Sequence, residues 1–364
     1  MMDRSLLECA VAVRMTCCRA GHAGASSCVP VVNSGSNKDR VLSLDASADA
    51  EDVAEAVAAY MEENSATPGC VILGDHSIAI RDPASLTSAG GRMLGVVVAI
   101  TGGAQGFGRG IADKLASEGA LVAIADVNDN AGQSFAADLQ KKYGTGAAIY
   151  VHADVTDLAG VRDACMRTVE AFGGVDLFIA SAGILKAGAL EDMDETTFDA
   201  VTAVNYKGFF LCTKAVTQWM KLQHKHNDGH FMDIVQINSR SGLVGSSRNF
   251  AYAGSKFGCI GLVQSFAIEL LEHNIKVNAV CPGNYYDGPL WSDPKNGLFV
   301  QYLNAGKVPG AKTVDDVRAY YTSRVPMQRG CVPEDVATAI MYLREQQYET
   351  GQALPVTGGQ EMLS

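Results

Sequence analysis

The sequence predicts an α/β protein built on a doubly wound parallel sheet with helices on both faces, preceded by a small N-terminal extension. Three observations predict it. Short apolar runs alternate with helical stretches from Met93 onward, a glycine-rich segment joins the first run to the first helix, and hydrophobic residues make up 48% of the chain against 19% charged. The 364 residues allow one large domain or two ordinary ones.

The expected strands are short, apolar and separated by helical stretches. They cover residues 96–101, 121–125, 148–151, 175–180, 234–238 and 275–280, and the first helix covers 107–118. Apolar strands that alternate with helices of ten residues or more indicate a parallel sheet covered on both faces. We therefore expect one domain over residues 93–364.

Residues 1–92 are expected to form an extension of unknown role. Residues 1–40 show no clear periodicity, which is typical of a poorly ordered lead-in. A helix is predicted at 47–62 and two strands at 70–73 and 77–80, and Asp82-Pro83 has the pattern of a helix start. This extension either packs on the following domain or is the remnant of a larger module.

Composition excludes several function classes. The net charge of −11 argues against binding to nucleic acid. No apolar run reaches the ~18 residues of a membrane span. The ten cysteines are scattered, which fits a reducing, cytoplasmic compartment. His224, His226 and His230 fall in a polar stretch that we interpret as a solvated turn, so no metal site is predicted.

The glycine-rich segment, residues 101–108, lies between the first strand and the first helix. Glycines at such a turn let the backbone approach a pyrophosphate, which binds at the helix N-terminus. Many glycine-rich segments are merely tight turns, but this one has a strand before it and a helix after it. Its candidate cofactor contacts are Thr101, Gly102, Gln105, Gly106, Phe107 and Gly108.

Asp126 ends the second strand, eighteen residues after Gly108, near the spacing expected of a ribose-binding carboxylate. A carboxylate there accepts hydrogen bonds from both ribose hydroxyls and repels a 2′-phosphate, so NAD is favoured over NADP. The alternative is an aspartate that begins a turn. Asp154 ends the third strand at the same edge and is a candidate adenine contact, although it is equally suited to capping the next helix.

Ser239, Tyr252 and Lys256 form the candidate catalytic group. Tyr252 and Lys256 lie one helical turn apart on one face, and Ser239 ends the preceding strand. A phenol is a poor base at neutral pH, and a nearby ammonium favours its ionised form. A tyrosine and a lysine at this spacing are also a common surface pair. Because Ser239, Tyr252 and Lys256 follow the glycine turn and Asp126 in this order along the chain, a catalytic role is favoured over a surface pair.

With these motifs the chain resembles the short-chain dehydrogenase/reductase family across nearly all of residues 93–364, which implies a Rossmann-type fold. The resemblance implies that Tyr252 is the general acid/base and that Ser239 orients the reacting oxygen. It also implies that Lys256 holds the nicotinamide ribose and tunes Tyr252. Asn205 matches the family's helix asparagine, which anchors a water in the proton relay.

Other matched positions extend the resemblance toward the C-terminus. Pro282-Gly283 matches the turn beside the nicotinamide, and residues 350–352 match the motif before the last strand. Ser181 stands where the family usually has asparagine, and with Gly183 it is a candidate cofactor contact. Residues 284–287 replace the threonine expected after Pro282-Gly283.

Four stretches are similar to the sorbitol-6-phosphate 2-dehydrogenase group of this family: residues 181–187, 237–242, 325–331 and 356–362. This resemblance implies NAD-dependent interconversion of D-sorbitol 6-phosphate and D-fructose 6-phosphate. Lys186 and Arg240 flank the expected pocket and are candidate phosphate contacts, although both types of residue are often solvated surface charges. Residues 291–324 lie where the family builds a substrate lid, and their aromatic residues are expected mainly to form its core.

Three other functions remain open from the sequence. One is a dehydrogenase for an unphosphorylated polyol or another small carbonyl compound. A second is a nucleotide sensor without turnover, which would need none of Asn205, Ser239, Tyr252 and Lys256. A third is a two-activity protein in which residues 1–92 end another catalytic domain. The family resemblance also implies a homotetramer.

Overall fold

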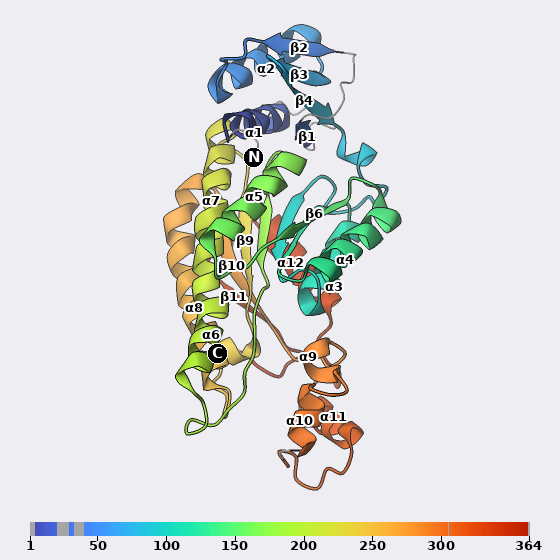
Figure 1. Cartoon of the computed structure of the whole chain (residues 1–364), viewed down its shortest axis with the longest axis vertical. Helices are drawn as coiled ribbons and strands as arrows, with labels where there is room; N and C mark the ends of the chain where they lie inside the picture. Colours follow the sequence, from blue (N-terminus) through green and yellow to red (C-terminus); the bar gives the residue numbers. More distant parts are fainter. Residues whose placement is uncertain (1–3, 20–28, 33–39, 305, 363–364) are drawn as a thin grey trace.

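The computed structural model describes residues 4–19, 29–32, 40–304 and 306–362. Its main body is a seven-stranded sheet with the order β11-β10-β9-β8-β5-β6-β7, in which every neighbouring pair is parallel (Figure 1). The strands are β5 (Val97–Thr101), β6 (Leu121–Asp126), β7 (Ala148–His152), β8 (Leu177–Ala180), β9 (Met232–Ile237), β10 (Ile275–Pro282) and β11 (Ala353–Val356). The predicted doubly wound fold is confirmed.

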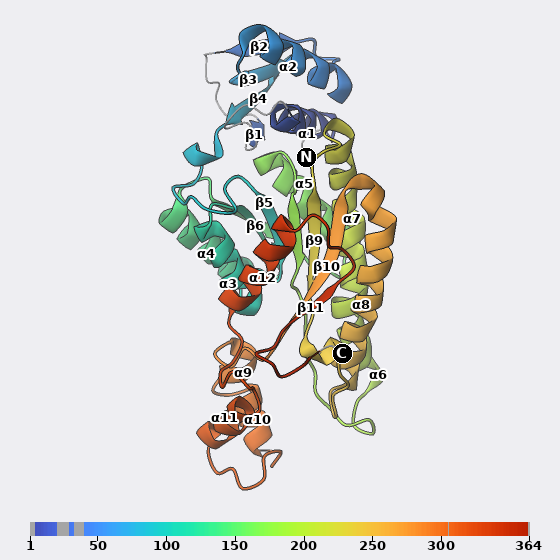
Figure 2. The same cartoon turned by 180° about the vertical axis from the view of Figure 1, so that it is seen from behind.

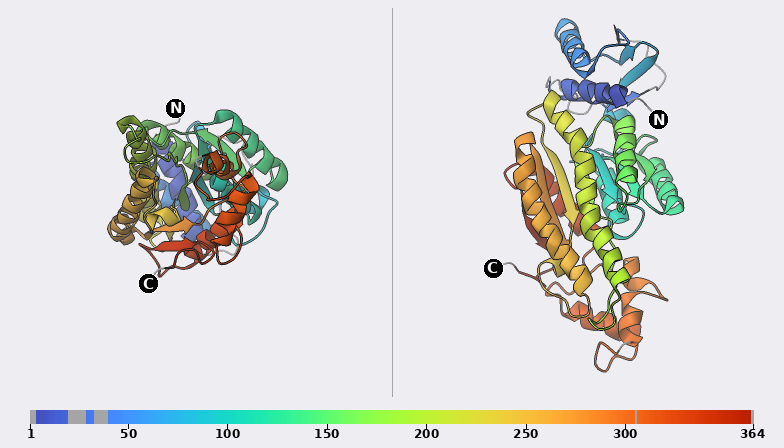
Figure 3. Two further views of the ribbon diagram at one scale, coloured as in Figure 1. Left: turned by 90° about the horizontal axis from the view of Figure 1, so that it is seen from below. Right: turned by 60° about the vertical axis from the view of Figure 1, so that its left-hand side comes forward.

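Helices cover both faces of this sheet. One face carries α3 (Gly106–Ser117), α4 (Asp129–Tyr143) and α12 (Pro333–Glu345), whereas the other carries α5 (Leu158–Phe172), α7 (Gly208–His226) and α8 (Phe250–Leu270). Figure 2 shows α12 crossing the first face, and the right-hand view of Figure 3 shows α7 and α8 side by side on the second. The five inner strands, from β10 to β6 in the sheet, are buried on both faces, which explains their continuous apolar sequences.

The order of strands reverses at β5, which pairs with β6 on one side and with β8 on the other. In an open parallel sheet the loops after the strands on either side of such a reversal diverge and leave a binding crevice at the carboxyl ends. Three short helices, α9 (Pro289–Ser292), α10 (Leu298–Asn304) and α11 (Val314–Ser323), extend beyond this edge at the lower end of Figure 1. We call residues 289–323 the lid.

The N-terminal region forms a second, four-stranded sheet with the order β1-β4-β3-β2. Its elements are α1 (Arg4–Arg19), β1 (Val29–Val32), β2 (Val41–Leu44), α2 (Ala50–Asn64), β3 (Cys70–Leu73) and β4 (His76–Arg81). The predicted helix and both predicted strands are present, and Asp82 accepts the Ala84 N–H at the start of a short 3-10 helix. This unit lies at the opposite end of the molecule from the lid (Figure 1).

The expectation of a poorly ordered lead-in is wrong for residues 4–19, which form α1; residues 20–28 and 33–39 lie outside the described residues. Helix α1 is wedged between α2 and the main body, where it contacts α5 and α7. It is therefore buried nearly all round, from Leu6 through Met15. A helix enclosed in this way has no polar face, so its sequence shows no amphipathic period.

A buried ion pair joins α1 to the main sheet. The Arg14 guanidinium donates to both carboxylate oxygens of Asp176, at 2.9 and 2.5 Å, and both side chains are at most 3% exposed. Asp176 precedes β8, and it also accepts the Val97 N–H of β5 and contacts His230 Nε2. Burial opposes ionisation of Asp176, but Arg14 and His230 lower its pKa well below the usual value. The carboxylate therefore connects α1, β5 and β8.

The predicted polar stretch with three histidines is divided by the structure. His224 and His226 belong to the last turn of α7, and only His230 lies in the following loop, where it contacts Asp176. Among the described residues no three His, Cys, Asp or Glu side chains gather as metal ligands would. No described helix is long and apolar enough to cross a membrane.

We predict that Arg14→Met destabilises the protein by about 3–5 kcal/mol, because it leaves a buried carboxylate without its main counter-charge. Arg4→Met is the matched control on the same helix. Arg4 pairs with Glu8 at the surface, where such pairs contribute about 0–1 kcal/mol. Urea unfolding of both variants checks the prediction, and equal small losses would contradict it.

Candidate active site

In the glycine-rich turn, residues 101–108, the backbone folds back closely on its own start and also approaches the loop after β8. Gly102 and Gly106 have φ values of +63° and +57°, a backbone region that favours glycine. A Cβ on Gly108 would lie 2.1 Å from the Gly102 carbonyl oxygen, so no other residue fits there. Gln105 precedes α3 without capping it through its side chain. The first N–H groups of α3 are thus left for an anion such as a pyrophosphate.

Thr101 links this turn to the loop after β8. Its hydroxyl oxygen accepts the N–H groups of Ser181 at 3.2 Å and Ala182 at 3.3 Å. A Cβ on Gly102 would also come within 2.7 Å of Ala182 Cα. The predicted contacts Thr101, Gly102 and Ser181 therefore meet at one place, at the point where the order of strands reverses.

Asp126 lies at the end of β6 beside the same turn, with 6% of its surface exposed. One carboxylate oxygen accepts the Ala104 N–H and the other accepts the Asn128 N–H, each at 3.0 Å. Asp126 is thus fixed against the glycine turn, where a nucleotide bound at α3 would present its ribose. Because each of its oxygens accepts a backbone N–H, the Asp126 carboxylate is held in one position.

Asp154 is exposed after β7, and its carboxylate accepts the N–H and hydroxyl of Thr156 at 2.9 and 2.8 Å. Asp157 caps α5 instead. The alternative of Asp154 as the helix cap is therefore wrong, whereas its contact with adenine stays a prediction.

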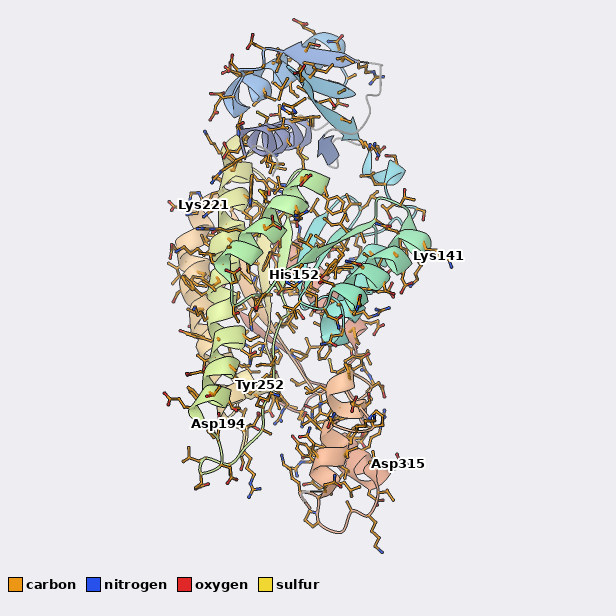
Figure 4. All side chains as sticks on the ribbon, viewed as in Figure 1. Lys141, His152, Asp194, Lys221, Tyr252 and Asp315 are labelled. Atoms are coloured by element: carbon orange, nitrogen blue, oxygen red, sulfur yellow. The ribbon has the colours of Figure 1, made fainter. Side chains whose placement is uncertain are left out.

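Helix α8 carries Tyr252 and Lys256 in its first two turns. The Lys256 ammonium is 3% exposed and donates to the Ile237 carbonyl at the end of β9, at 2.7 Å. It lies 5.7 Å from the centre of the Tyr252 ring. The phenol oxygen of Tyr252 makes no hydrogen bond with any described residue. Figure 4 shows Tyr252 at the end of the sheet that faces the lid.

Ser239 lies two residues after the end of β9. Its hydroxyl oxygen accepts the Ser241 N–H at 3.1 Å, and its own N–H donates to the Asn238 side chain at 2.8 Å. The Asn238 amide also donates to the Lys256 carbonyl at 3.0 Å. The turn after β9 and the helix α8 are therefore held together by one buried asparagine, which brings Ser239 to the edge that carries Tyr252.

Asn205 lies in a π-helical turn, Ala203–Lys207, between α6 (Glu195–Thr202) and α7. Such turns occur often at functional sites. The buried Asn205 side chain bonds both backbone groups of Ile184, at 2.8 and 2.9 Å, and donates to Ser255 Oγ at 3.1 Å. A Cβ on Gly183 would be 3.3 Å from Asn205 Oδ1 and 3.8 Å from Lys256 Nζ. Gly183, Asn205 and Lys256 are therefore neighbours.

The Arg240 guanidinium, predicted to face a phosphate, bonds Glu361 near the C-terminus through Nε at 2.9 Å and through a second nitrogen. A phosphate would have to displace this carboxylate. Lys186, by contrast, is exposed and has no acidic partner among the described residues.

The turn after Pro282 is fixed by a hydrogen bond from the Gly283 N–H to the Val356 carbonyl at 2.9 Å. Gly283 and Glu361 both line a cavity of about 430 Å³ between the turn after β10 and residues 355–361.

The lid has its own apolar core, formed by Tyr286, Trp291, Leu298, Phe299, Val308 and Val317. The aromatic residues of the lid form this core or pack against it, as expected for most of them, and the Trp291–Phe299 ring distance of 5.0 Å illustrates this packing. Leu185, in the loop after β8, also packs against it. The lid is therefore held as a unit beside the crevice.

Comparisons with known proteins agree with this architecture. A family model described as short chain dehydrogenase matches residues 96–291. Sorbitol-6-phosphate 2-dehydrogenase of Escherichia coli K12 is 37% identical over 268 residues, which is 73% of this chain and 98% of that protein.

Solved structures of similar fold also include dehydrogenases and reductases. Sorbitol-6-phosphate 2-dehydrogenase from Erwinia amylovora aligns with a TM-score of 0.67 and 35% identity over 73% of this chain and all of that one. The 3-ketoacyl-(acyl-carrier-protein) reductase from Brucella melitensis complexed with NADH aligns with a TM-score of 0.62 and 27% identity, over 74% and 99% of the two chains.

The chain belongs to the short-chain dehydrogenase family, and it is an oxidoreductase that acts on CH–OH groups with a nicotinamide cofactor. Within that family it is similar to sorbitol-6-phosphate 2-dehydrogenases over nearly their whole length. The roles of the individual site residues stay predictions.

Sequence reasoning missed several residues that shape this site. Asn238 falls within the matched stretch 237–242 but was not recognised as a structural residue, although its side chain joins β9 to α8. The partnership of Arg240 with Glu361 was also missed, because the two residues are 121 positions apart. Such pairs have no local pattern in a single sequence.

We predict that Tyr252→Phe lowers kcat by about 10²–10⁴-fold, because it removes the only ionisable oxygen of this side chain while the ring stays. Binding of NAD, measured by fluorescence titration, should be unchanged. Tyr206→Phe is the control, since Tyr206 is an exposed tyrosine whose ring lies against Gly258 of the same helix. Near-full activity of Tyr252→Phe would contradict the assignment.

Proposed function

We propose that this protein is an NAD-preferring dehydrogenase that interconverts D-sorbitol 6-phosphate and D-fructose 6-phosphate. The observation that carries the reaction is the gathering of Ser239, Tyr252, Lys256 and Asn205 at the sheet edge that also bears the glycine turn. The similarity to sorbitol-6-phosphate 2-dehydrogenases supports the substrate.

In the proposed mechanism Tyr252 removes the proton from the C2 hydroxyl of the polyol, and Ser239 donates a hydrogen bond to the same oxygen. The Lys256 ammonium favours the ionised phenol through its positive charge. Bound NAD supplies the acceptor for the hydride that leaves C2. In the reverse direction Tyr252 returns the proton to the carbonyl oxygen.

The residues around the glycine turn suit this cofactor. The uncapped N–H groups of α3 would hold the pyrophosphate, and Asp126 would accept bonds from the adenine-side ribose. Lys256 has donors left besides the one bonded to Ile237, and these would hold the nicotinamide-side ribose. Ser181, Gly183 and Pro282-Gly283 would border the nicotinamide, Phe107 would lie beside the pyrophosphate, and Asp154 would meet the adenine.

The alternative function is reduction or oxidation of an unphosphorylated polyol or another small carbonyl compound. The similarity to a 3-ketoacyl reductase keeps this alternative open, because that relative is named for a different substrate. A nucleotide sensor without turnover is disfavoured, since Ser239, Tyr252, Lys256 and Asn205 would then have no role.

We also propose a cytoplasmic homotetramer whose catalytic part is residues 93–364, with residues 1–92 as an attached extension. Seven of the described cysteines, Cys9, Cys70, Cys165, Cys212, Cys259, Cys281 and Cys331, are free thiols, which suits a reducing compartment. Helices α7 and α8 expose Phe210, Phe257 and Ile268, which suits contact between copies. Light scattering that returns the mass of a monomer would exclude the tetramer.

For the cofactor we predict a much higher kcat/KM with NAD than with NADP, because the Asp126 carboxylate repels a 2′-phosphate. Asp126→Asn keeps an acceptor for the Ala104 N–H and removes the charge. It should therefore lower the ratio of kcat/KM with NAD to kcat/KM with NADP by tenfold or more, which corresponds to a loss of roughly 1.4 kcal/mol of repulsion. Asp129→Asn, in the same turn, is the control. Equal efficiency of the unmodified protein with both cofactors would refute the preference.

For the substrate we predict that D-sorbitol 6-phosphate is oxidised with a kcat/KM at least a hundredfold above that of D-sorbitol. Two charged hydrogen bonds to a phosphate, at about 1.5–3 kcal/mol each, would account for this ratio. A steady-state screen of polyols with and without phosphate, followed by NADH absorbance, measures it. Equal rates with both sugars would instead favour the unphosphorylated substrate.

A further inference from the structure

Three segments converge at the mouth of the active site. The loop after β8, residues 181–190, packs against the lid core through Leu185. It is also bonded to the loop before α8, since the Gly188 N–H donates to the Arg248 carbonyl at 3.0 Å. The lid and two loops of the main body therefore share one boundary, and Figure 4 shows the lid on one side of Tyr252 and the segment of Asp194 on the other.

Each of these segments brings an exposed cation to this boundary. Lys186 lies two residues before Gly188, Arg248 lies four residues before Tyr252, and Lys307 lies between α10 and α11. Among the described residues none of the three has an acidic partner. The arginines nearby differ, because Arg240, Arg318 and Arg329 pair with Glu361, Asp287 and Asp335.

Arg248 occupies an unusual backbone position, with φ at +56°. This left-handed region is costly for a side chain with a Cβ, and asparagine or glycine would fit it better. The backbone bond from Gly188 holds the residue in this conformation. The arginine is therefore kept where the local backbone does not favour it, which is common at ligand-binding positions.

Lys307 lies in the lid, where its charge interacts with that of Arg248. Its ammonium lies 3.9 Å from the centre of the Tyr302 ring, a cation–π contact that fixes its direction. The surrounding lid atoms lower the pKa of Lys307 by desolvation, and the charge of Arg248 lowers it further. Two cations that repel each other without a counter-ion are stabilised by an anion bound between them.

On the basis of the sugar-phosphate substrate proposed above, we propose that Arg248 and Lys307, with Lys186 beside them, form the receptor for the phosphate group. In D-sorbitol 6-phosphate four carbons follow the reacting C2 before the phosphate. Its receptor must therefore lie beyond Tyr252, toward the mouth of the site. Arg248 and the lid satisfy this requirement, whereas Arg240 follows Ser239 directly and is already neutralised by Glu361.

This arrangement also gives the lid a role in specificity. The phosphate would join a residue of the main body to a residue of the lid, so a phosphorylated substrate would draw the lid toward the crevice. A substrate without phosphate would leave Arg248 and Lys307 to repel each other. The same two side chains thus add affinity for the phosphate ester and add none for its neutral analogue.

The test uses Arg248→Asn, which suits the left-handed backbone, together with Lys307→Gln in the full chain. The probe is inorganic phosphate, titrated calorimetrically into the NAD-bound protein. Each substitution should weaken phosphate binding roughly tenfold or more, the loss expected for one charged hydrogen bond. Lys307→Arg keeps the charge and should retain binding. Lys312→Gln, an exposed lid lysine whose backbone N–H bonds Asp316, is the matched control.

The kinetic arm separates this inference from the proposed function. KM for D-sorbitol 6-phosphate should rise roughly tenfold or more in each variant with kcat little changed, since the phosphate does not react. KM for D-sorbitol should stay the same. Phosphate binding that is absent from the unmodified protein, or unchanged in the double variant, would overturn the inference. Failure of D-sorbitol 6-phosphate as a substrate, with phosphate binding lost in the variants, would overturn only the proposed sugar.

Discussion

The hydrogen bond from the buried Lys256 ammonium to the Ile237 carbonyl is the interaction on which the rest of the site depends. It fixes the start of helix α8 against the end of strand β9, and Tyr252 precedes Lys256 on that helix by one turn. A buried ammonium is costly unless its donors are satisfied, so this contact has a single favourable position. Asn238 then joins the same helix to the Ser239 turn, and Asn205 lies beside Lys256 through Gly183. The position of each candidate catalytic group follows from one anchored lysine.

Much of this architecture could be predicted because its signals are local. Each strand of the main sheet is a short apolar run, and the glycines of residues 102–108 are required by close approaches within one turn. Asp126 was recognisable by its distance from that turn. Helix α1 escaped prediction because it is enclosed on all sides and has no polar face. The contacts of Arg14 with Asp176 and of Arg240 with Glu361 were also beyond reach, because they join residues far apart in sequence.

The shared fold and the proposed substrate specificity involve different parts of the molecule. The sheet edge, with its glycine turn and Tyr252, is the proposed place of hydride transfer between an alcohol and a nicotinamide, and relatives named for different substrates share the fold that builds it. The lid and the loop of residues 181–190 surround the place where the rest of the substrate must lie. Lys186 of that loop and Lys307 of the lid have no acidic partner among the described residues. With the phosphate receptor proposed above, substrate choice in this chain becomes an electrostatic property of its most peripheral segments.

The position of the four-stranded unit has a consequence for how the enzyme can be attached to other objects. This unit lies at the amino ends of the parallel strands, and the reacting groups lie at their carboxyl ends, so the full length of the sheet separates the two (Figure 1). A strand of five or six residues spans about 17–20 Å. A bead, an electrode or a fused protein fastened to residues 40–81 would therefore leave the substrate entrance facing open solution. Diffusion of substrate and product would proceed as in the unattached enzyme.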